Sequence, residues 1–598
     1  MALRRSPTAI AAVGLLVVLA APARAQVPTF EGDEVTVPGL RPQLIATTPA
    51  FVTVLSGEDL RRLGLVTLGD ALRFLAEVSV RTAGAGPGGF QQPSIRGSSP
   101  QQVLVLIDGV PLNATAQFGV NLSTLSLAAV ERVEVLRGPY SAIYGSALGG
   151  VIAVRTRADP RPLVLVNGGS FGSAGAAIRL GSGWPGGQLS LAGQYLTTAG
   201  DRPNSDAARW SGTLRLTLGL APRFLSLTAQ RSTGVTGLPG PTFFPTPGDR
   251  LTDARTLLSL NWGQDAGERT VQGRLWYLED TLAQQSPGFS SDDRGTAFGG
   301  GWQWLTRRQN GAVLTAGLEL TRMRFASTST FAAFQSAAAT AAGYLQYDAL
   351  LGRKTLVGVG ARYEIHSTYA GQFNPRLGFV HFLSDRLRLR GGLGRAFRAP
   401  TFFELAYPGC SNPTLRPEEA WAADLGVEAA PRPGLLLRLN GFYTSARDLI
   451  VGGCAPQNVG SARIAGFSAE VVGRLAPGWM VQGNATWTDG ADRGTGLPLL
   501  RVPTRQANLV LRHTRPDGAA ASLLVNYVSA RDDLDTSTFP AVRVTLPGYV
   551  TLDLRYERRV GSIVLLAGVD NVLDARFETL RGFPAAGRTV FVQIGSSF

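Results

Sequence analysis

The chain has 598 residues, of which 44% are hydrophobic and only 17% are charged, and its formal net charge is +14. Soluble globular proteins usually carry about 25% charged residues, so this composition is unusual for a soluble protein. Only one of the 57 basic residues is a lysine, Lys354, and no dense basic run contains interleaved aromatic residues. A nucleic-acid partner is therefore not predicted.

The first residues have the pattern of an export signal. Arg4 and Arg5 precede an apolar run from Ala9 to Ala21, and Ala23-Arg24-Ala25 fits a small-x-small cleavage site. The apolar run is shorter than the ~20 residues that a membrane-spanning helix needs. We therefore predict a signal peptide over residues 1–25.

Residues 26–40 form a short tail that contains an acidic pair followed by β-branched residues. This pattern favours an extended strand over a helix. An extended segment can bind a partner protein by adding a strand to the edge of the partner's sheet. The residues concerned are Asp33, Glu34, Val35, Thr36 and Val37.

Residues 41–158 predict a small domain of short helices and apolar strands that are separated by Gly and Pro turns. Ser56 is expected to cap a first helix, because Asp59 follows it by three residues. The stretch from Leu68 to Leu75 predicts a second helix.

No catalytic motif is found in the chain. Gly84, Gly86 and Gly89 spell GxGxxG, but a dinucleotide-binding fingerprint needs a helix directly after it. Pro87 and Pro93 forbid such a helix, so a flexible loop is the better interpretation. HExxH and Walker A sequences are absent from the sequence, no GxSxG nucleophile elbow between a strand and a helix is predicted, and no enzyme is predicted.

The rest of the chain consists of recurring segments of alternating polarity. In one of them, Leu189, Leu191 and Tyr195 alternate with Ser190 and Gln194. Alternation with period two predicts strands that turn an apolar face to lipid and a polar face to the lumen of a membrane barrel. A soluble all-β protein would show the same alternation, but it would have to hide hundreds of residues in one core.

Three stretches carry a family resemblance: Ser94–Gly97, Val103–Asn113 and Val133–Gly145. They resemble the plug domain of TonB-dependent outer-membrane receptors, and most of all the cobalamin transporters among them. The final strand, which closes on Phe598, resembles the assembly signal of bacterial outer-membrane barrels. Similar family patterns of the barrel lie at Phe397–Pro400, Asn412–Glu418, Ile464–Glu470, Val569–Asp574 and Gly582–Arg588.

The resemblance implies a membrane all-β fold, namely a 22-stranded antiparallel barrel of the bacterial outer membrane with an N-terminal α+β plug domain inside its lumen. The chain would divide into the signal peptide (1–25), a TonB-box tail (26–40), the plug (41–158) and the barrel (159–598). Such a receptor, expected as a monomer without a required cofactor, would import a scarce ligand with energy delivered by TonB. TonB would bind the segment Asp33–Val37.

The resemblance favours cobalamin as the ligand. A ferric siderophore would use the same fold, and the positive net charge would suit an anionic chelate. A passive porin, adhesin or other structural outer-membrane protein is the alternative of a different class. Haem is disfavoured, because His366, His381 and His513 all lie outside the interval from Pro400 to Asn412, where haem receptors usually carry a histidine.

By the same resemblance, two loops at the apex of the plug would contact cobalamin. These loops correspond to residues 84–92 and 113–121. Amide groups can hydrogen-bond the amide arms of a corrinoid, and aromatic faces can cover its apolar ring. The expected ligand-binding residues are Phe90, Gln91, Gln92, Asn113, Gln117 and Phe118.

Cobalamin transporters also order their outer loops with calcium that is held by clustered carboxylates. Calcium takes six to eight oxygen ligands, and the equivalent region here is less acidic than the cluster of the family. A structural calcium ion is therefore a weaker expectation. Its ligands would come from Asp201, Asn204, Asp206, Asp249 and Asp253.

The two cysteines of the chain, Cys410 and Cys454, both lie in turn-rich stretches. In an exported protein, an even pair of cysteines predicts one disulfide. We expect this bond to join two neighbouring extracellular loops.

Overall fold

The computed structural model describes residues 34–36, 42–44, 48–83, 89–138, 140–220 and 222–596. The expected signal peptide, Asp33 and Val37 of the expected TonB box, and Phe598 lie outside the described residues. Within the described part of the chain, no helix is both long and apolar enough to cross a membrane.

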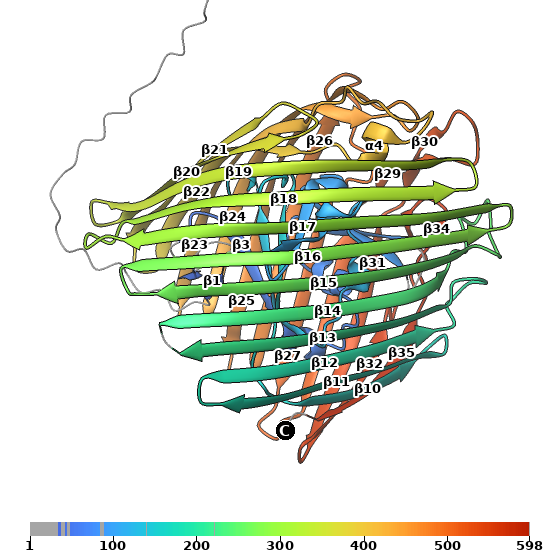
Figure 1. The fold of residues 1–598 in the computed structure, drawn as a ribbon. Coiled ribbons are helices and arrows are strands. Elements are labelled where there is room, and N and C mark those ends of the chain that lie inside the picture. The colour runs from blue at the N-terminus through green and yellow to red at the C-terminus, as the bar shows by residue number, and fades with distance from the viewer. Residues whose placement is uncertain are drawn as a thin grey trace, which may run out of the picture.

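Twenty-two antiparallel strands close into a barrel (Figure 1), and the predicted fold class is confirmed. The barrel closes where its first strand pairs with its last, from Val164 opposite Ser596 to Gly169 opposite Phe591. Closure leaves no open sheet edge, so every backbone group of the wall can pair. The barrel strands are β10 (Leu163–Gly169), β11 (Ser173–Trp184), β12 (Gly187–Thr198), β13 (Ala207–Leu220), β14 (Arg223–Gly237), β15 (Arg250–Asp265), β16 (Arg269–Ser286), β17 (Phe289–Arg307), β18 (Val313–Ser329), β19 (Ala333–Leu351), β20 (Thr355–His366), β21 (Gln372–Ser384), β22 (Leu387–Arg398), β23 (Glu418–Arg432), β24 (Leu435–Val451), β25 (Gln457–Ala476), β26 (Trp479–Asp492), β27 (Arg505–Thr514), β28 (Ala520–Val528), β31 (Tyr549–Val560), β32 (Ile563–Asp570) and β35 (Thr589–Ser596).

The predicted alternation of side chains is confirmed along the wall. In β12, Leu191 and Tyr195 are exposed on the outside of the barrel by 43% and 47%, whereas Ser190 is buried on the lumen side. In β35, Val590, Val592 and Ile594 are likewise exposed. An apolar outer face of this kind is what a lipid bilayer requires.

The two ends of the barrel differ in the length of their connections. At one end, connections such as 185–186 and 561–562 span two residues, whereas at the other end 399–417 and 529–548 are long. Outer-membrane barrels place short turns in the periplasm and long loops outside the cell, so we call the second end the outer end. It carries α4 (Phe402–Ala406), the hairpin β29 (Arg531–Asp535) with β30 (Val542–Leu546), and β33 (Glu578–Leu580) with β34 (Phe583–Pro584).

The plug is built around a five-stranded sheet in the order β3-β8-β9-β6-β7. Figure 1 shows it in blue inside the barrel. Its apolar core continues onto Trp276, Leu278 and Leu524 of the wall, which fixes the plug in the lumen by burial of apolar surface. The plug strands are β3 (Phe51–Ser56), β4 (Val78–Ala83), β5 (Phe90–Ile95), β6 (Val103–Ile107), β7 (Val110–Pro111), β8 (Val130–Arg137) and β9 (Gly150–Thr156).

The helices of the plug are short and begin at polar caps. The Ser56 hydroxyl accepts a hydrogen bond from the Glu58 amide at 3.2 Å, as the sequence predicts, and Thr67 forms a capping box with Asp70. No helix follows Gly89, because β5 begins at Phe90. The helical segments are α1 (Gly57–Arg62), α2 (Leu68–Leu72), η3 (Pro100–Gln102), η4 (Leu112–Ala114), η5 (Leu122–Thr124) and α3 (Ser141–Tyr144).

Candidate functional site

Two of the six expected ligand-binding residues have structural roles inside the plug. Asn113 accepts a hydrogen bond from the Val105 amide at 2.9 Å and donates one to the Val103 carbonyl at 3.0 Å. Gln91 is 4% exposed, and its backbone amide donates to Asn121 Oδ1 at 2.9 Å. Asn113 therefore holds strand β6 in place, and neither side chain is presented to the outside.

Gln92, Gln117 and Phe118 meet at the outer end of the lumen, where the plug touches the loop that carries α4. Gln117 Oε1 accepts hydrogen bonds from the amides of Phe402 and Phe403 at 2.9 and 3.3 Å, so it satisfies the first turn of α4. Gln92 Nε2 donates to the Phe118 carbonyl. The plug apex and this outer loop are thus one hydrogen-bonded unit. Phe90, at the start of β5, is half-buried.

An aromatic cluster surrounds this contact. Phe118 is 51% exposed, and its ring lies 5.0 Å from that of Phe403. Phe403 in turn lies 5.4 Å from Phe325 and 5.2 Å from Tyr407. We define the outer aromatic cluster as Phe118, Phe325, Phe334, Phe402, Phe403 and Tyr407.

Sequence reasoning missed every member of this cluster except Phe118. The available signal was the density of aromatic residues from Phe402 to Tyr407, directly after the family pattern Phe397–Pro400. Aromatic faces at the mouth of a lumen can cover a planar, weakly polar ligand.

Four of the five expected calcium ligands lie in the outer connections 199–206 and 238–249, and Asp253 lies near the start of β15. Arginines bind two of the carboxylates. Arg250 binds both oxygens of Asp206 at 2.7 and 2.9 Å. Arg209 binds both oxygens of Asp253 at 2.7 and 2.8 Å. A carboxylate held in a bidentate arginine pair has little capacity left for a cation.

The remaining donors do not complete a calcium site. The Asn204 amide donates to the carbonyls of Leu238, Thr246 and Asp249, so its nitrogen points into the loop. Burial raises the pKa of Asp201. Among the described residues, no group of three or more acidic, histidine or cysteine side chains is placed to hold a metal. The donor set in this arrangement does not fit calcium, and binding of the ion stays a prediction.

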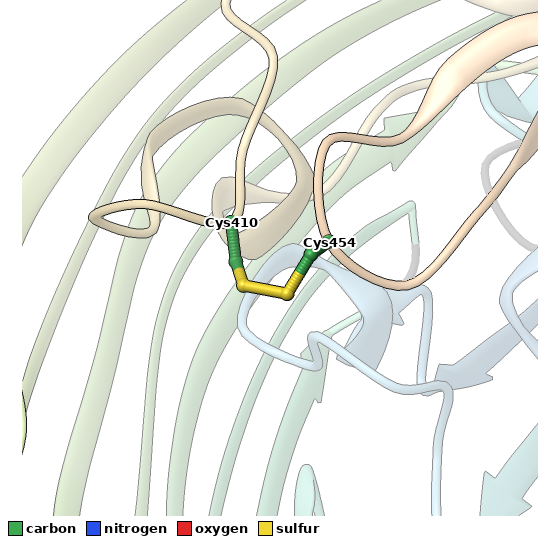
Figure 2. The surroundings of a disulfide bond; sticks show 2 residues. All are labelled: Cys410 and Cys454. Carbon is green, nitrogen blue, oxygen red and sulfur yellow. A yellow bond between two sulfur atoms is a disulfide. The ribbon is translucent and has the colours of Figure 1, made fainter. Parts of the chain in front are cut away.

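Cys410 and Cys454 form a disulfide with an S–S distance of 1.92 Å. It joins the loop between β22 and β23 to the turn between β24 and β25, both at the outer end (Figure 2). The bond therefore restrains the loop that presents α4 and its aromatic residues.

The described part of the expected TonB box is strand β1 (Glu34–Thr36). It pairs antiparallel with β2 (Pro42–Leu44), with Val35 opposite Gln43. In Figure 1 this hairpin lies at the end of the barrel opposite β34. The segment is therefore extended and lies on the periplasmic side.

Barrel arginines hold the plug strand that follows this segment. Arg376 donates to the Pro49 carbonyl at 2.7 Å, and Arg438 donates to the Val52 carbonyl at 3.3 Å. Arg390 donates to the Ala50 carbonyl between them. A force applied to the N-terminal tail would load these hydrogen bonds, because Pro49 and Ala50 lie close to the tail in sequence.

A buried charge cluster locks the plug to the wall deeper in the lumen. Arg96 pairs with Glu77 at 2.5 Å within the plug and with Asp424 of β23 at 2.6 Å. Arg137 pairs with Glu470 of β25 at 2.7 Å and lies 3.5 Å from Glu77. We call these five residues the lock cluster.

Glu77 is the centre of the lock cluster. Burial alone would raise the pKa of its carboxyl, but Arg96 and Arg137 overcome burial and lower this pKa to about 2. Ser468 and Asn440 of the wall also donate to Glu77 Oε1, at 2.6 and 3.2 Å. Glu77 therefore stays ionised and ties the plug to the barrel.

The three histidines lie on different parts of the wall. His366 stacks on Tyr369 with ring centres 3.9 Å apart, and His381 Nδ1 lies 2.7 Å from the Thr355 hydroxyl. His513 packs against Trp479 at 4.5 Å. Each histidine has a local structural partner, so the arrangement offers no support for haem.

The barrel is closed, and a plug is locked into its lumen. An aromatic cluster lies at its outer mouth, and an extended strand lies on its periplasmic side. Together these features define a plugged outer-membrane receptor. Two family descriptions match the chain: "TonB dependent receptor-like, beta-barrel" over residues 159–572 and "TonB-dependent Receptor Plug Domain" over residues 45–151. The chain belongs to the family of TonB-dependent receptors and is a protein of the bacterial outer membrane.

Individual relatives differ in their ligands. The vitamin B12 transporter BtuB of Vibrio cholerae serotype O1 is 26% identical over 596 residues, covering 93% of this chain and 94% of the relative. The siderophore receptor PirA from Acinetobacter baumannii superposes with a TM-score of 0.81 at 18% identity, over 93% of this chain and all of PirA. The ferric-catecholate import receptor Fiu from E. coli K12 has a TM-score of 0.81 at 16% identity, over 97% of this chain and all of Fiu. These two structures share the fold.

Proposed function

We propose that this receptor binds cobalamin, or a closely related corrinoid, at its outer end and imports it with energy from TonB. The observation that carries the proposal is the similarity to vitamin B12 transporters over 93% of the chain. The outer aromatic cluster supports it, because a corrinoid offers a broad apolar ring to aromatic faces. Gln92 Nε2 donates to the Phe118 carbonyl, which places this side chain beside the cluster, where its amide oxygen could accept hydrogen bonds from the amide arms of such a ligand.

Import would proceed without covalent chemistry. Ligand binding at Phe118 and α4 would shift the plug, since the apex and the outer loop are hydrogen-bonded through Gln117. TonB would then capture the segment Asp33–Val37 by strand pairing. The pairing of β1 with β2 supports this step, because one antiparallel partner can be exchanged for another.

A ferric siderophore is the second candidate ligand. The net charge of +14 favours it, since a positive surface attracts an anionic chelate over long range. Equilibrium binding to the purified, detergent-folded receptor separates the two ligands. We expect saturable binding of cyanocobalamin and none of a panel of ferric siderophores. Retention of a siderophore without binding of cyanocobalamin would replace the proposed substrate.

The same titration tests calcium. A calcium-dependent gain in cyanocobalamin affinity would require the pairs Asp206–Arg250 and Asp253–Arg209 to open, because both carboxylates are engaged. We therefore expect the affinity to be the same with calcium and with a chelator. A large calcium effect would show that the outer loops rearrange to build the site.

Phe403→Ala is expected to weaken cyanocobalamin binding by about tenfold, because it removes the ring that joins Phe118 to the rest of the aromatic cluster. The matched control is Phe331→Ala, which removes an aromatic ring at the outer end that is 78% exposed and stacks on Phe289 rather than on the cluster. Equal affinities of the two variants would rule out the cluster as the binding platform. Isothermal titration calorimetry makes the comparison.

A further inference from the structure

A cavity of about 320 Å³ lies between the plug and the part of the wall formed by β10–β12 and β27–β35. Arg501 and Arg531 line it at the outer end, and Arg555 of β31 lines it deeper in the lumen. The plug contributes β4, including Arg81, to the opposite side. The cavity thus follows the boundary along which a ligand would pass if the plug moved.

Arg81 is a half-buried cation that forms no ion pair among the described residues. Among the described residues its side chain makes no hydrogen bond or ion pair, and its Nε is fully buried. Burial, together with the like charges of Arg501 and Arg531, outweighs the attraction of Asp533 and lowers the pKa of Arg81 to about 10. A buried cation is costly when it is unpaired, so this position favours an anion.

The nearby carboxylate of Asp533 already accepts hydrogen bonds at both of its oxygens. Its Oδ1 accepts from Arg501 Nε at 2.6 Å and from the Leu534 amide at 2.8 Å. Its Oδ2 accepts from the Arg581 amide at 2.8 Å. Asp533 therefore pairs with Arg501, and its single negative charge is shared with Arg81 and Arg531, which also lie near it.

Arg531 is positioned but only partly satisfied. Its Nη2 donates to the Glu578 carbonyl, and its guanidinium lies over the Tyr549 ring at 5.5 Å. Its Nη1 is buried and has no hydrogen-bond partner among the described residues. The guanidinium is thus held in a fixed orientation with a free donor, an arrangement suited to binding an oxyanion.

We propose that Arg81, Arg501 and Arg531 form a binding site for an anionic oxygen group of the imported ligand. The inference rests on the proposed import function and deepens it. In a corrinoid the group is the phosphodiester of the nucleotide loop; in a ferric siderophore it is one of the oxygens that carry the charge of the chelate. The site holds this group at the plug–wall boundary.

The test compares two corrinoids that differ in this group, since dicyanocobinamide lacks the phosphodiester that cyanocobalamin carries. Arg81→Gln is expected to weaken cyanocobalamin binding by about ten- to a hundredfold and to change dicyanocobinamide binding by less than about twofold. Arg81→Lys, which keeps the charge, should restore part of the loss. Arg531→Gln, in an outer hairpin rather than in the plug, is the second variant and should behave like Arg81→Gln.

The matched control is Arg416→Gln, which removes an exposed arginine of the outer end that already pairs with Asp448 at 2.6 Å and lies away from the cavity. It should leave both affinities unchanged. Unchanged cyanocobalamin binding in Arg81→Gln and Arg531→Gln, or an equal loss for both corrinoids, overturns the site. If the wild type binds neither corrinoid, the proposed substrate fails, and the site is judged on an Fe(III) tris-catecholate complex. Arg81→Gln must then weaken binding of that complex, and an unchanged affinity overturns the site.

Discussion

Deletion of Asp33–Val37 is expected to abolish ligand uptake by whole cells and to leave binding at the outer end unchanged. The described part of the segment, Glu34–Thr36, lies on the periplasmic side and is extended and paired with Pro42–Leu44. Strand addition to TonB depends on backbone groups of this segment. Uptake of radiolabelled cyanocobalamin by cells, measured beside equilibrium binding to the purified receptor, separates the two effects.

A point variant sharpens this test. Val35→Pro removes the central N–H of the strand and should reduce uptake nearly as much as the deletion, because proline cannot donate to a sheet ladder. Val35→Ala is the matched control, since it shortens the side chain but keeps the backbone donor. Normal uptake by the deletion variant would indicate a passive pore and would contradict active import.

Replacement of Glu77 by glutamine is expected to destabilise the docked plug by about 3–5 kcal/mol, because it leaves Arg96 and Arg137 buried with fewer counter-charges. The plug should then unfold at a lower urea concentration than the barrel. Hydrogen exchange of plug amides gives a direct measure. The matched control is Glu58→Gln, a half-exposed plug glutamate whose ion pair among the described residues is with Arg62 on α1.

Glu77 also predicts a pH dependence. Its pKa in the folded protein is about 2, below the ordinary value of 4.5, so the unfolded plug takes up a proton more readily. The stabilisation, on the order of 3 kcal/mol, is therefore fully present above about pH 4.5 and is lost as the pH falls towards 2. Glu77→Gln should remove this dependence on pH. The same acid profile in Glu77→Gln and in the wild type would contradict the role of the lock cluster.

Local patterns predicted the architecture because they depend on neighbouring residues. The alternation of Leu191 and Tyr195 with Ser190 follows from the period of a strand, and it survives in the barrel. Ser56 caps α1 for a reason that is contained within three residues. Cys410 and Cys454 had no other partner, so their pairing needed only the oxidising compartment.

The contacts of the candidate site were less predictable, because the sequence does not show whether a polar side chain faces solvent or hydrogen-bonds the backbone. Asn113 was expected to contact ligand, yet both ends of its amide bind strand β6. Asp206 and Asp253 are expected to hold calcium, but Arg250 and Arg209 pair with them across the intervening strand β14. The sequence gives no sign of these approaches, since the register of adjacent strands sets them.

The sequence by itself determined that this chain is an exported, plugged barrel of a particular family. The strand period, the turn residues and the family motifs each involve residues that are close together in sequence. Only the tertiary structure decided which charges meet. Arg137 and Glu470 are separated by 333 positions but lie 2.7 Å apart. Their meeting requires both the closure of the barrel and one orientation of the plug within it. Buried charges are stable only in such pairs, so the contacts that lock the plug exist only in the assembled fold.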